Sequence, residues 1–234
     1  EGVKVSLNDC LACSGCVTSA ETVLLEQQST AEFMRAVRGS EAVVVTISSQ
    51  SRASIGRLHG LTAAEAAMRM SAFLKALGCV AVFDDSLGRD LALVQTFEEF
   101  WQAYHQQPGA PCLPMLASEC PGWVCYAEKT HGSVALPHMS RTRSAVAIQG
   151  ALVKSALPPR LGLPPSQVYH CFISPCYDKK LEASREDYRV GDYRQIDCVL
   201  ATTELHDLMK AQGFDILASP RAPLDRILPP ENPP

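Results

Sequence analysis

Three cysteines near the start of the chain, Cys10, Cys13 and Cys16, are separated by two residues each. This spacing lets a tight loop turn successive thiolates toward one metal centre, and Ser14 and Gly15 supply small, flexible backbone beside it. Bacterial ferredoxins use the same spacing for three ligands of a four-iron–four-sulfur cluster. The Cys-Pro pair that follows in ferredoxins is absent here, so a fourth ligand must come from elsewhere. We therefore expect an iron–sulfur cluster at these three cysteines.

Zinc is the main alternative at this position, bound by the three cysteines and one histidine. Chance clustering of thiols is a second alternative, and disulfides are a third, since the chain has ten cysteines. Disulfides are typical of small secreted domains with poor cores. A chain of 234 residues that is 47% hydrophobic can bury a substantial core. Metal binding in a reducing compartment is therefore favoured over a disulfide framework.

Two further cysteines, Cys120 and Cys176, each lie beside a proline, which lacks a backbone N–H and fixes the local turn. Each follows a segment expected to be extended and precedes an expected helix. Ligands of parallel α/β sheets bind beyond the carboxyl ends of the strands, so we expect Cys120 and Cys176 to converge on one site. Lys179 and Lys180 would balance the negative charge of a thiolate-ligated cluster. The alternatives are ordinary buried thiols and a solvated helix start.

The elements that position these residues alternate along the chain. The residues expected to be extended are 42–47, 79–83, 113–117, 168–173 and 198–200. The expected helices are 19–38, 63–77, 91–104, 122–129, 142–157, 178–185 and 203–212. Thr62 and Glu65 form a capping-box pattern at the start of one helix, and Pro158 and Pro159 are expected to end another. Alternating strands and helices imply an α/β fold with a mostly parallel sheet.

Composition excludes several classes of partner. The net charge of −4 gives no general attraction to nucleic acid or acidic lipid, and no apolar run approaches the roughly 20 residues that span a bilayer. We therefore expect a soluble protein with neither nucleic acid nor membrane as partner. The sequence contains no nucleophile elbow, P-loop or dinucleotide-binding glycine pattern. Because the chain begins with Glu1 and ends in proline-rich sequence, we expect a fragment.

Four motifs, in this order, resemble the iron-only-hydrogenase-like proteins of eukaryotes, the cytosolic iron–sulfur assembly factors also called nuclear prelamin A recognition factor-like proteins. The motifs are 8–16 (NDCLACSGC), 118–123 (SECPGW), 126–132 (YAEKTHG) and 175–183 (PCYDKKLEA). The likeness runs from the start of the chain to about residue 213.

The resemblance implies an iron-only-hydrogenase-like α/β fold, with mostly parallel sheets flanked by helices. The organisation it implies is a cluster-binding segment at 1–39, an α/β domain at 40–218 that is incomplete at its C-terminus, and a proline-rich tail at 219–234 that we expect to be disordered.

The resemblance also implies two 4Fe–4S clusters. Cys10, Cys13 and Cys16 match three ligands of the N-terminal cluster, whose fourth ligand lies upstream in the family. Cys120 and Cys176 match two ligands of the inner cluster, whose other two lie in a C-terminal motif. We therefore expect truncation at both ends, with clusters incomplete or absent in this fragment.

Hydrogen-activating enzymes resemble the chain but carry a proton-relay cysteine where this sequence has Glu119. A methionine that contacts their di-iron unit corresponds to Ser174, whereas Lys179 matches their cyanide-contacting lysine. The resemblance therefore implies a protein that is not an enzyme, and a hydrogenase is the less favoured alternative.

The function implied is a part in the cytosolic iron–sulfur assembly machinery, delivering clusters to cytosolic and nuclear apoproteins. The implied partners are those acceptors and a targeting complex of WD40-propeller and HEAT-repeat proteins, in the cytoplasm and also the nucleus. A protein-interaction module with purely structural clusters is one alternative, and an α/β fold with vestigial metal sites is another.

Overall fold

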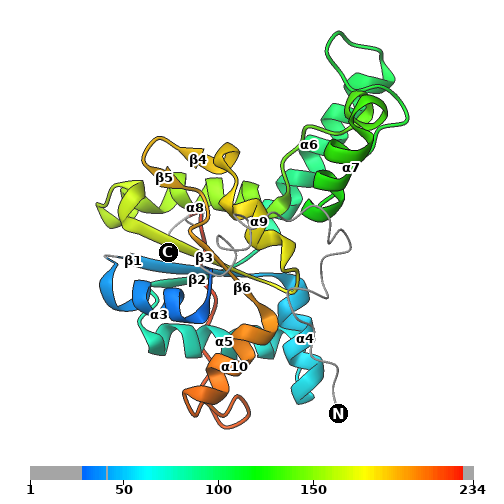
Figure 1. Ribbon diagram of the computed structural model, residues 1–234. Helices are drawn as coiled ribbons and strands as arrows, with labels where there is room; N and C mark the ends of the chain where they lie inside the picture. Colours follow the sequence, from blue (N-terminus) through cyan, green and yellow to red (C-terminus); the bar gives the residue numbers. More distant parts are fainter. Residues whose placement is uncertain (1–27, 41, 229–234) are drawn as a thin grey trace.

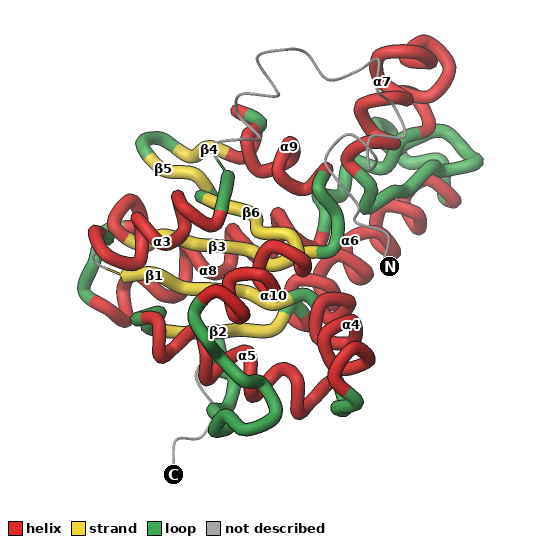
Figure 2. Tube along the Cα trace, turned by 60° about the horizontal axis from the view of Figure 1, so that its bottom comes forward, coloured by secondary structure: helices red, strands yellow, loops and turns green. Residues whose placement is uncertain are grey.

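The structure is a computed structural model that describes residues 28–40 and 42–228 (Figure 1). Its central feature is a four-stranded sheet in the order β2–β1–β3–β6, with every neighbouring pair parallel. Figure 2 shows the strands in this order, from β6 at the top to β2 at the bottom. The predicted parallel α/β fold is confirmed. The strands are β1 Ala42–Ile47, β2 Ala81–Asp84, β3 Val168–Ser174 and β6 Cys198–Ala201.

Helices cover both faces of this sheet because strand side chains point alternately to opposite sides. Along β1, Val43, Val45 and Ile47 pack on one face, and Ala42 and Val44 on the other. The first face is covered by α3 (Thr30–Gly39), α4 (Ser49–His59), α5 (Ala63–Leu77) and α10 (Thr202–Ala211). The second is covered by α8 (Ala145–Leu161), which lies above the strands in Figure 1.

Three helices lie toward one end of the sheet. They are α6 (Ser86–Tyr104), α7 (Pro121–Ala135) and α9 (Asp178–Ser184). α6 packs on α8, and α7 packs on α9. In Figure 1, α6 and α7 extend together away from the sheet, at the upper right. The short hairpin of β4 (Arg189–Val190) and β5 (Tyr193–Arg194) follows α9.

Helix boundaries agree with the sequence where capping side chains are present. Thr62 and Glu65 make the predicted capping box at the start of α5, which ends at Gly78 with φ of 114°. α4 was not predicted, because its polar sequence has little amphipathic pattern; the side chain of Ser48 caps it by accepting a hydrogen bond from the N–H of Ser51. Of the helix predicted at 19–38, residues 19–27 lie outside the described residues. In the described part, the helix begins at Thr30.

Two expectations about local structure are wrong. Pro158 and Pro159 do not end their helix, which continues through Leu161 and closes at Gly162, with φ of 69°, where the N–H of Gly162 donates to the carbonyl of Pro158. The segment 113–117 is not a strand and makes only an isolated bridge, between Leu116 and Met139.

The expectation of a disordered tail is also wrong for residues 219–228. Asp225 lies beside the edge strand β2, where its N–H donates to the carbonyl of Val82 (2.7 Å) and its carboxylate accepts from the N–H of Val82 (2.8 Å). Lys75 pairs with the same carboxylate (2.9 Å), and Ile227 is buried in the core. Proline content alone was misleading, because Pro220 and Pro223 lie in a segment that packs along the edge strand of the sheet.

Among the residues that the structure describes, no helix has the length and apolar character needed to cross a bilayer.

The outer face of α6 is strongly apolar although it is exposed. Leu93, Phe97, Trp101 and Tyr104 are 70%, 62%, 52% and 62% exposed. Phe97 and Trp101 contact each other one helical turn apart, with ring centroids separated by 6.1 Å. This face is the largest departure from the usual burial of aromatic side chains.

Candidate metal centre

The carboxyl ends of all four parallel strands lie at one edge of the sheet. Cys176 follows β3 at this edge, directly before α9, and Cys120 reaches it from the loop before α7. Two segments that are more than fifty residues apart in sequence thus meet through the packing of α7 on α9. The edge of the sheet predicted for the site is the edge where the structure places both cysteines.

Cys120 is the N-cap residue of α7 and is exposed. Its Sγ accepts a hydrogen bond from the N–H of Trp123 (3.5 Å), and its own N–H donates to Ser118 Oγ (3.0 Å). Pro121, at the first helical position, suits a helix start because it needs no N–H partner. The N-terminus of a helix attracts negative charge, so this position suits a thiolate bound to a metal.

Cys176 is half-buried, and its N–H donates to Ser174 Oγ (3.2 Å). Burial raises the pKa of its thiol, and the charges of Asp178 and Cys120 raise it further. Hydrogen bonds from the N–H groups of Asp178 and Lys179 lower it. The two cysteines are therefore near enough to interact electrostatically, and a cation between them would relieve their mutual repulsion.

The close approach of α7 and α9 depends on Gly122. A Cβ atom at this position would lie 2.7 Å from Asp178 Oδ2 and 3.8 Å from Cys120 Sγ. Asp178 is itself buried, and its Oδ1 has no hydrogen-bond partner among the described residues. Burial raises the pKa of Asp178, although Lys179 lowers it. The Asp178 carboxylate and Cys120 Sγ thus both lie beside Gly122, and both influence Cys176 electrostatically.

Lys179 and Lys180, expected either to balance cluster charge or to be solvated, are both buried. Lys179 pairs with Glu182 (2.5 Å). Lys180 pairs with Glu204 (2.7 Å) and donates to the carbonyl of Gln28 (2.7 Å). The solvated alternative is wrong. Each ammonium group is paired with a carboxylate, so much of its positive charge is already balanced and is not available to offset the negative charge of a cluster.

The described residues do not complete a metal site by themselves. No group of three or more His, Cys, Asp or Glu side chains within them is arranged to hold a metal ion. Two neighbouring thiols have the donor chemistry of an iron–sulfur cluster and supply two of the four thiolates that such a cluster takes. Cys10, Cys13 and Cys16 lie outside the described residues. Ligation by any of the five cysteines stays a prediction.

The remaining described thiols fall into other surroundings. Cys79, Cys171 and Cys198 are buried, Cys125 is half-buried, and Cys112 is exposed on a loop. Cys171 and Cys198 are paired in register on β3 and β6, and burial raises the pKa of Cys171. The structure contains no disulfide between described cysteines.

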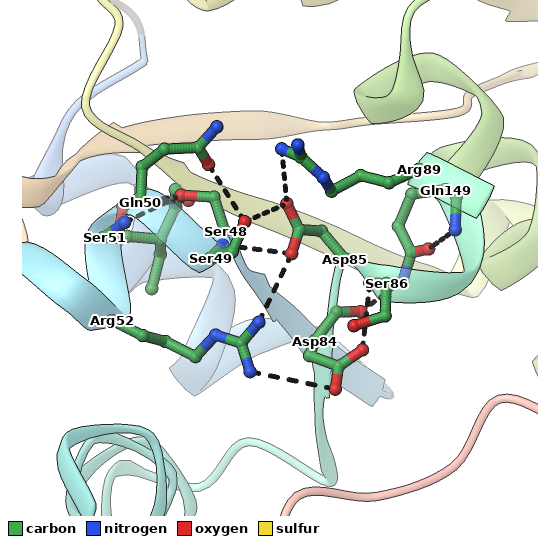
Figure 3. Close-up of polar contacts among 12 residues, drawn as sticks. Ser48, Ser49, Gln50, Ser51, Arg52, Asp84, Asp85, Ser86, Arg89 and Gln149 are labelled. Carbon is green, nitrogen blue, oxygen red and sulfur yellow. Dashed lines mark hydrogen bonds and ion pairs between the residues drawn. The ribbon is translucent and has the colours of Figure 1, made fainter. Parts of the chain in front are cut away.

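A second polar group at the same edge was missed in the sequence. Figure 3 shows Asp85, directly after β2, facing the start of α4. Its buried carboxylate accepts from the N–H of Ser49 (3.0 Å) and pairs with Arg52 (3.6 Å) and Arg89 (3.9 Å). Burial raises the pKa of Asp85, and the two arginines lower it. The sequence signal that could have revealed this group is the polar residues directly after two predicted strands. Ion pairs, rather than thiols, occupy this part of the edge.

A cavity of about 460 Å³ lies beside the Cys120 turn. Its lining includes Ser118, Glu119, Trp123, Arg141 and Arg185. Glu119 is exposed, so the carboxylate next to Cys120 points into solvent-accessible space.

Comparison with known proteins agrees with this fold. Residues 41–232 match the family described as the C-terminal domain of the iron only hydrogenase large subunit. The chain is 45% identical to Protein NAR1 of Arabidopsis thaliana over 243 residues, covering 97% of this chain and 51% of that protein. It is 45% identical to cytosolic iron-sulfur assembly component 3 of Mus musculus over 238 residues, covering 97% and 50%. The chain thus spans about half the length of these relatives.

Among solved structures, the chain is similar to FeFe-hydrogenases. One, from a study of oxygen inactivation, has a TM-score of 0.77 and 26% identity, covering 84% of this chain and 50% of that one. Apo FeFe-hydrogenase HydA1 from Chlamydomonas reinhardtii has a TM-score of 0.76 and 28% identity, covering 85% and 52%.

Proposed function

The chain belongs to the family formed by the C-terminal domain of the iron only hydrogenase large subunit, and from this premise we propose that it acts in cytosolic iron–sulfur cluster assembly. The relatives with 45% identity are named for iron–sulfur assembly or as NAR1 rather than as hydrogenases. The observation that carries the proposal is the meeting of Cys120 and Cys176 through the packing of α7 on α9.

In this proposal, Cys120 and Cys176 hold an inner 4Fe–4S cluster, and Cys10, Cys13 and Cys16 hold a second. The remaining ligands come from outside the described residues. A thiolate-ligated cluster, when bound, supplies iron and sulfide that can be passed to another set of thiolates. Cys176 is half-buried and Cys120 is exposed, so the Cys120 side of the cluster would face solvent and an incoming acceptor.

In this proposal, the protein is not an enzyme. Glu119 lines the cavity beside Cys120, and a carboxylate there differs from the relay thiol that the hydrogenase resemblance would require. A carboxylate is ionised at neutral pH and gives up its proton at a far lower pH than a thiol. Iron-only hydrogenase activity is therefore the least favoured function.

The proposed partners are apoproteins that accept clusters and a targeting complex of WD40-propeller and HEAT-repeat proteins. The relatives' names support a cytoplasmic location, and we extend the proposal to the nucleus. The proposed partners include neither nucleic acid nor membrane.

The test compares cluster binding and transfer in the full-length protein. Anaerobic reconstitution with iron and sulfide should give Cys120→Ala and Cys176→Ala variants with less bound iron and weaker visible absorption than wild type. The matched control is Cys112→Ala, which removes an exposed thiol held beside Pro137, past the end of α7 opposite Cys120, and should retain full iron content. Wild-type protein loaded with labelled iron should pass label to an apo-acceptor; retention of all label would contradict delivery.

A second candidate function, a protein-interaction module with structural clusters, is favoured by the exposed apolar face of α6. Exposed apolar patches of this kind mark protein interfaces. A Phe97→Asp substitution in the full-length protein separates the two functions. If it abolishes binding to the targeting complex while iron content and transfer stay unchanged, binding and delivery are distinct activities. If it changes neither, the α6 face does not support this second function.

A further inference from the structure

We propose that His59 and His206 form a binding site for a divalent transition-metal ion such as Zn²⁺, at the end of α4 remote from the carboxyl edge of the sheet. The two side chains come from different helices: His59 is the last residue of α4, and His206 lies in the middle of α10. Their Nε2 atoms are 3.2 Å apart. The site goes beyond the proposed iron–sulfur function and does not depend on it.

The separation of the two nitrogens fits a shared metal ion. Zinc binds imidazole nitrogen at about 2.0–2.1 Å in a tetrahedral arrangement, which places two such nitrogens about 3.3 Å apart. The imidazole planes are inclined by 67°, with centroids 5.3 Å apart, so both rings can present Nε2 to one point without stacking. A direct hydrogen bond between the rings is the competing explanation, because the distance also fits a donor and an acceptor.

The surroundings of His206 favour neutral imidazole, which is the form that binds metal. Burial lowers the pKa of His206, and the nearby charges of Lys210 and His59 lower it further, against a raising effect of Asp207. Both side chains are half-buried, which leaves one side open to solvent. Because no third protein ligand is grouped with them among the described residues, water molecules would complete the coordination.

A metal ion here would join the two helices that flank the carboxyl edge of the sheet. Near their first turns, α4 and α10 already contact each other through Ser51 Oγ and Thr202 Oγ1, which are 2.7 Å apart. A second link at His59 and His206 would fix the two helices relative to each other. Since the pair of imidazoles is brought together only in the folded protein, metal bound at this site would also raise the melting temperature.

The test uses the full chain labelled with ¹⁵N in its six histidines and titrated with Zn²⁺. Imidazole spectra distinguish this site from thiols that also bind zinc. We expect the Nε2 resonances of His59 and His206 to shift together, in proportion to bound metal. Each of His59→Ala and His206→Ala should weaken zinc binding at the remaining imidazole on the order of 100-fold, because each removes the other ligand of a chelating pair.

The control is His105→Ala, which removes an exposed histidine at the end of α6 and should leave both resonances responsive to zinc. Zinc that leaves the His59 and His206 rings unchanged while it binds elsewhere would overturn the proposal and identify the contact as a hydrogen bond only. Equal zinc affinity at His206 in wild type and in His59→Ala would overturn it as well.

Discussion

At the scale of single residues, the candidate centre combines two thiols with charges of both signs. Cys120 is positioned by the start of α7, and Cys176 by the end of the buried strand β3. The position of Cys176 could be predicted from sequence, because the ends of parallel strands share one edge. The reason given for Cys120 was wrong, since 113–117 is not a strand, and Cys120 reaches the site through the packing of α7 on α9. Asp178 could not be predicted as a buried group, since a carboxylate near a helix start is ordinarily solvated. Its burial follows from Gly122, which lets α7 approach.

The buried ring of His170 is a second case in which a single residue affects the stability of the protein. Its Nε2 contacts Thr46 Oγ1 (2.9 Å), and its Nδ1 contacts the carbonyl of Gln195 (3.1 Å). Burial lowers the pKa of His170 to about 3, with Lys154 adding to the effect and the Gln195 contact opposing it. The unfolded chain takes up this proton below about pH 6.5, whereas the folded protein does not.

Stability should therefore fall as pH drops from 6.5 toward 3. The single ring accounts for a loss of about 2 kcal/mol in the free energy of unfolding at about pH 5 relative to neutral pH. Urea denaturation of cluster-free protein at several pH values measures this slope. His170→Gln, which cannot titrate, should flatten the slope, and His105→Gln should not. An unchanged slope in His170→Gln would show that the ring is not responsible.

At the scale of elements, the sequence predicted most helices and strands but not how they are tied together. The helix expected at 91–104 begins five residues earlier, after Asp85, whose side chain makes no capping hydrogen bond and instead accepts from the N–H of Ser49. α4 was missed because its buried residues are few. Contacts between elements depend on side chains far apart in sequence, and periodicity does not reveal them.

Glu99 makes such a contact between elements that are far apart in sequence. From α6, its carboxylate accepts hydrogen bonds from Ser140 Oγ, the N–H of Arg141 (2.7 Å) and Thr142 Oγ1 (3.1 Å), so it holds the segment that leads into α8. Glu99→Gln should lower the free energy of unfolding by about 2 kcal/mol, as expected for lost hydrogen bonds to a charged group. Chemical denaturation measures it. Glu98→Gln, which alters a neighbouring exposed carboxylate, should change stability little.

The effect of Glu99 should also depend on pH. Burial raises the pKa of its carboxyl, but the hydrogen bonds outweigh burial and lower it overall. The stabilisation is therefore present above the unfolded pKa and is lost as pH falls through the lower folded value. Wild type and Glu99→Gln should converge in stability at acid pH; a constant difference down to low pH would contradict this role.

Gly122→Ala tests the approach of α7 to α9. The new Cβ would meet Asp178 Oδ2 at 2.7 Å. Because this carboxylate is buried and has little room to move, we expect the helices to separate, at a cost of about 1–3 kcal/mol in unfolding free energy. The variant should also lose iron on reconstitution, because Cys120 moves away from Cys176. Gly132→Ala lies on the same helix with its nearest contact at 3.5 Å and should be neutral or stabilising. Similar iron content in both variants would mean that helix approach does not position the thiols.

At the scale of the whole molecule, the parallel sheet brings distant segments to one edge. The alternation of strands and helices was enough to predict that the sheet is parallel, but the order β2–β1–β3–β6 was not predicted, because it depends on which faces pack together. The segment at 219–228 shows the same limit, since its proline-rich sequence reads as a tail and its position is fixed by contacts with β2 and α5.

The central claim is that Cys120 and Cys176 bind one iron–sulfur cluster. The most direct measurement is an anomalous difference map at the iron absorption edge, from crystals of full-length protein purified or reconstituted without oxygen. We predict a compact group of iron atoms with both Sγ atoms in its coordination shell. Iron bound to neither sulfur, or to only one of the two in a fully loaded protein, would contradict the account.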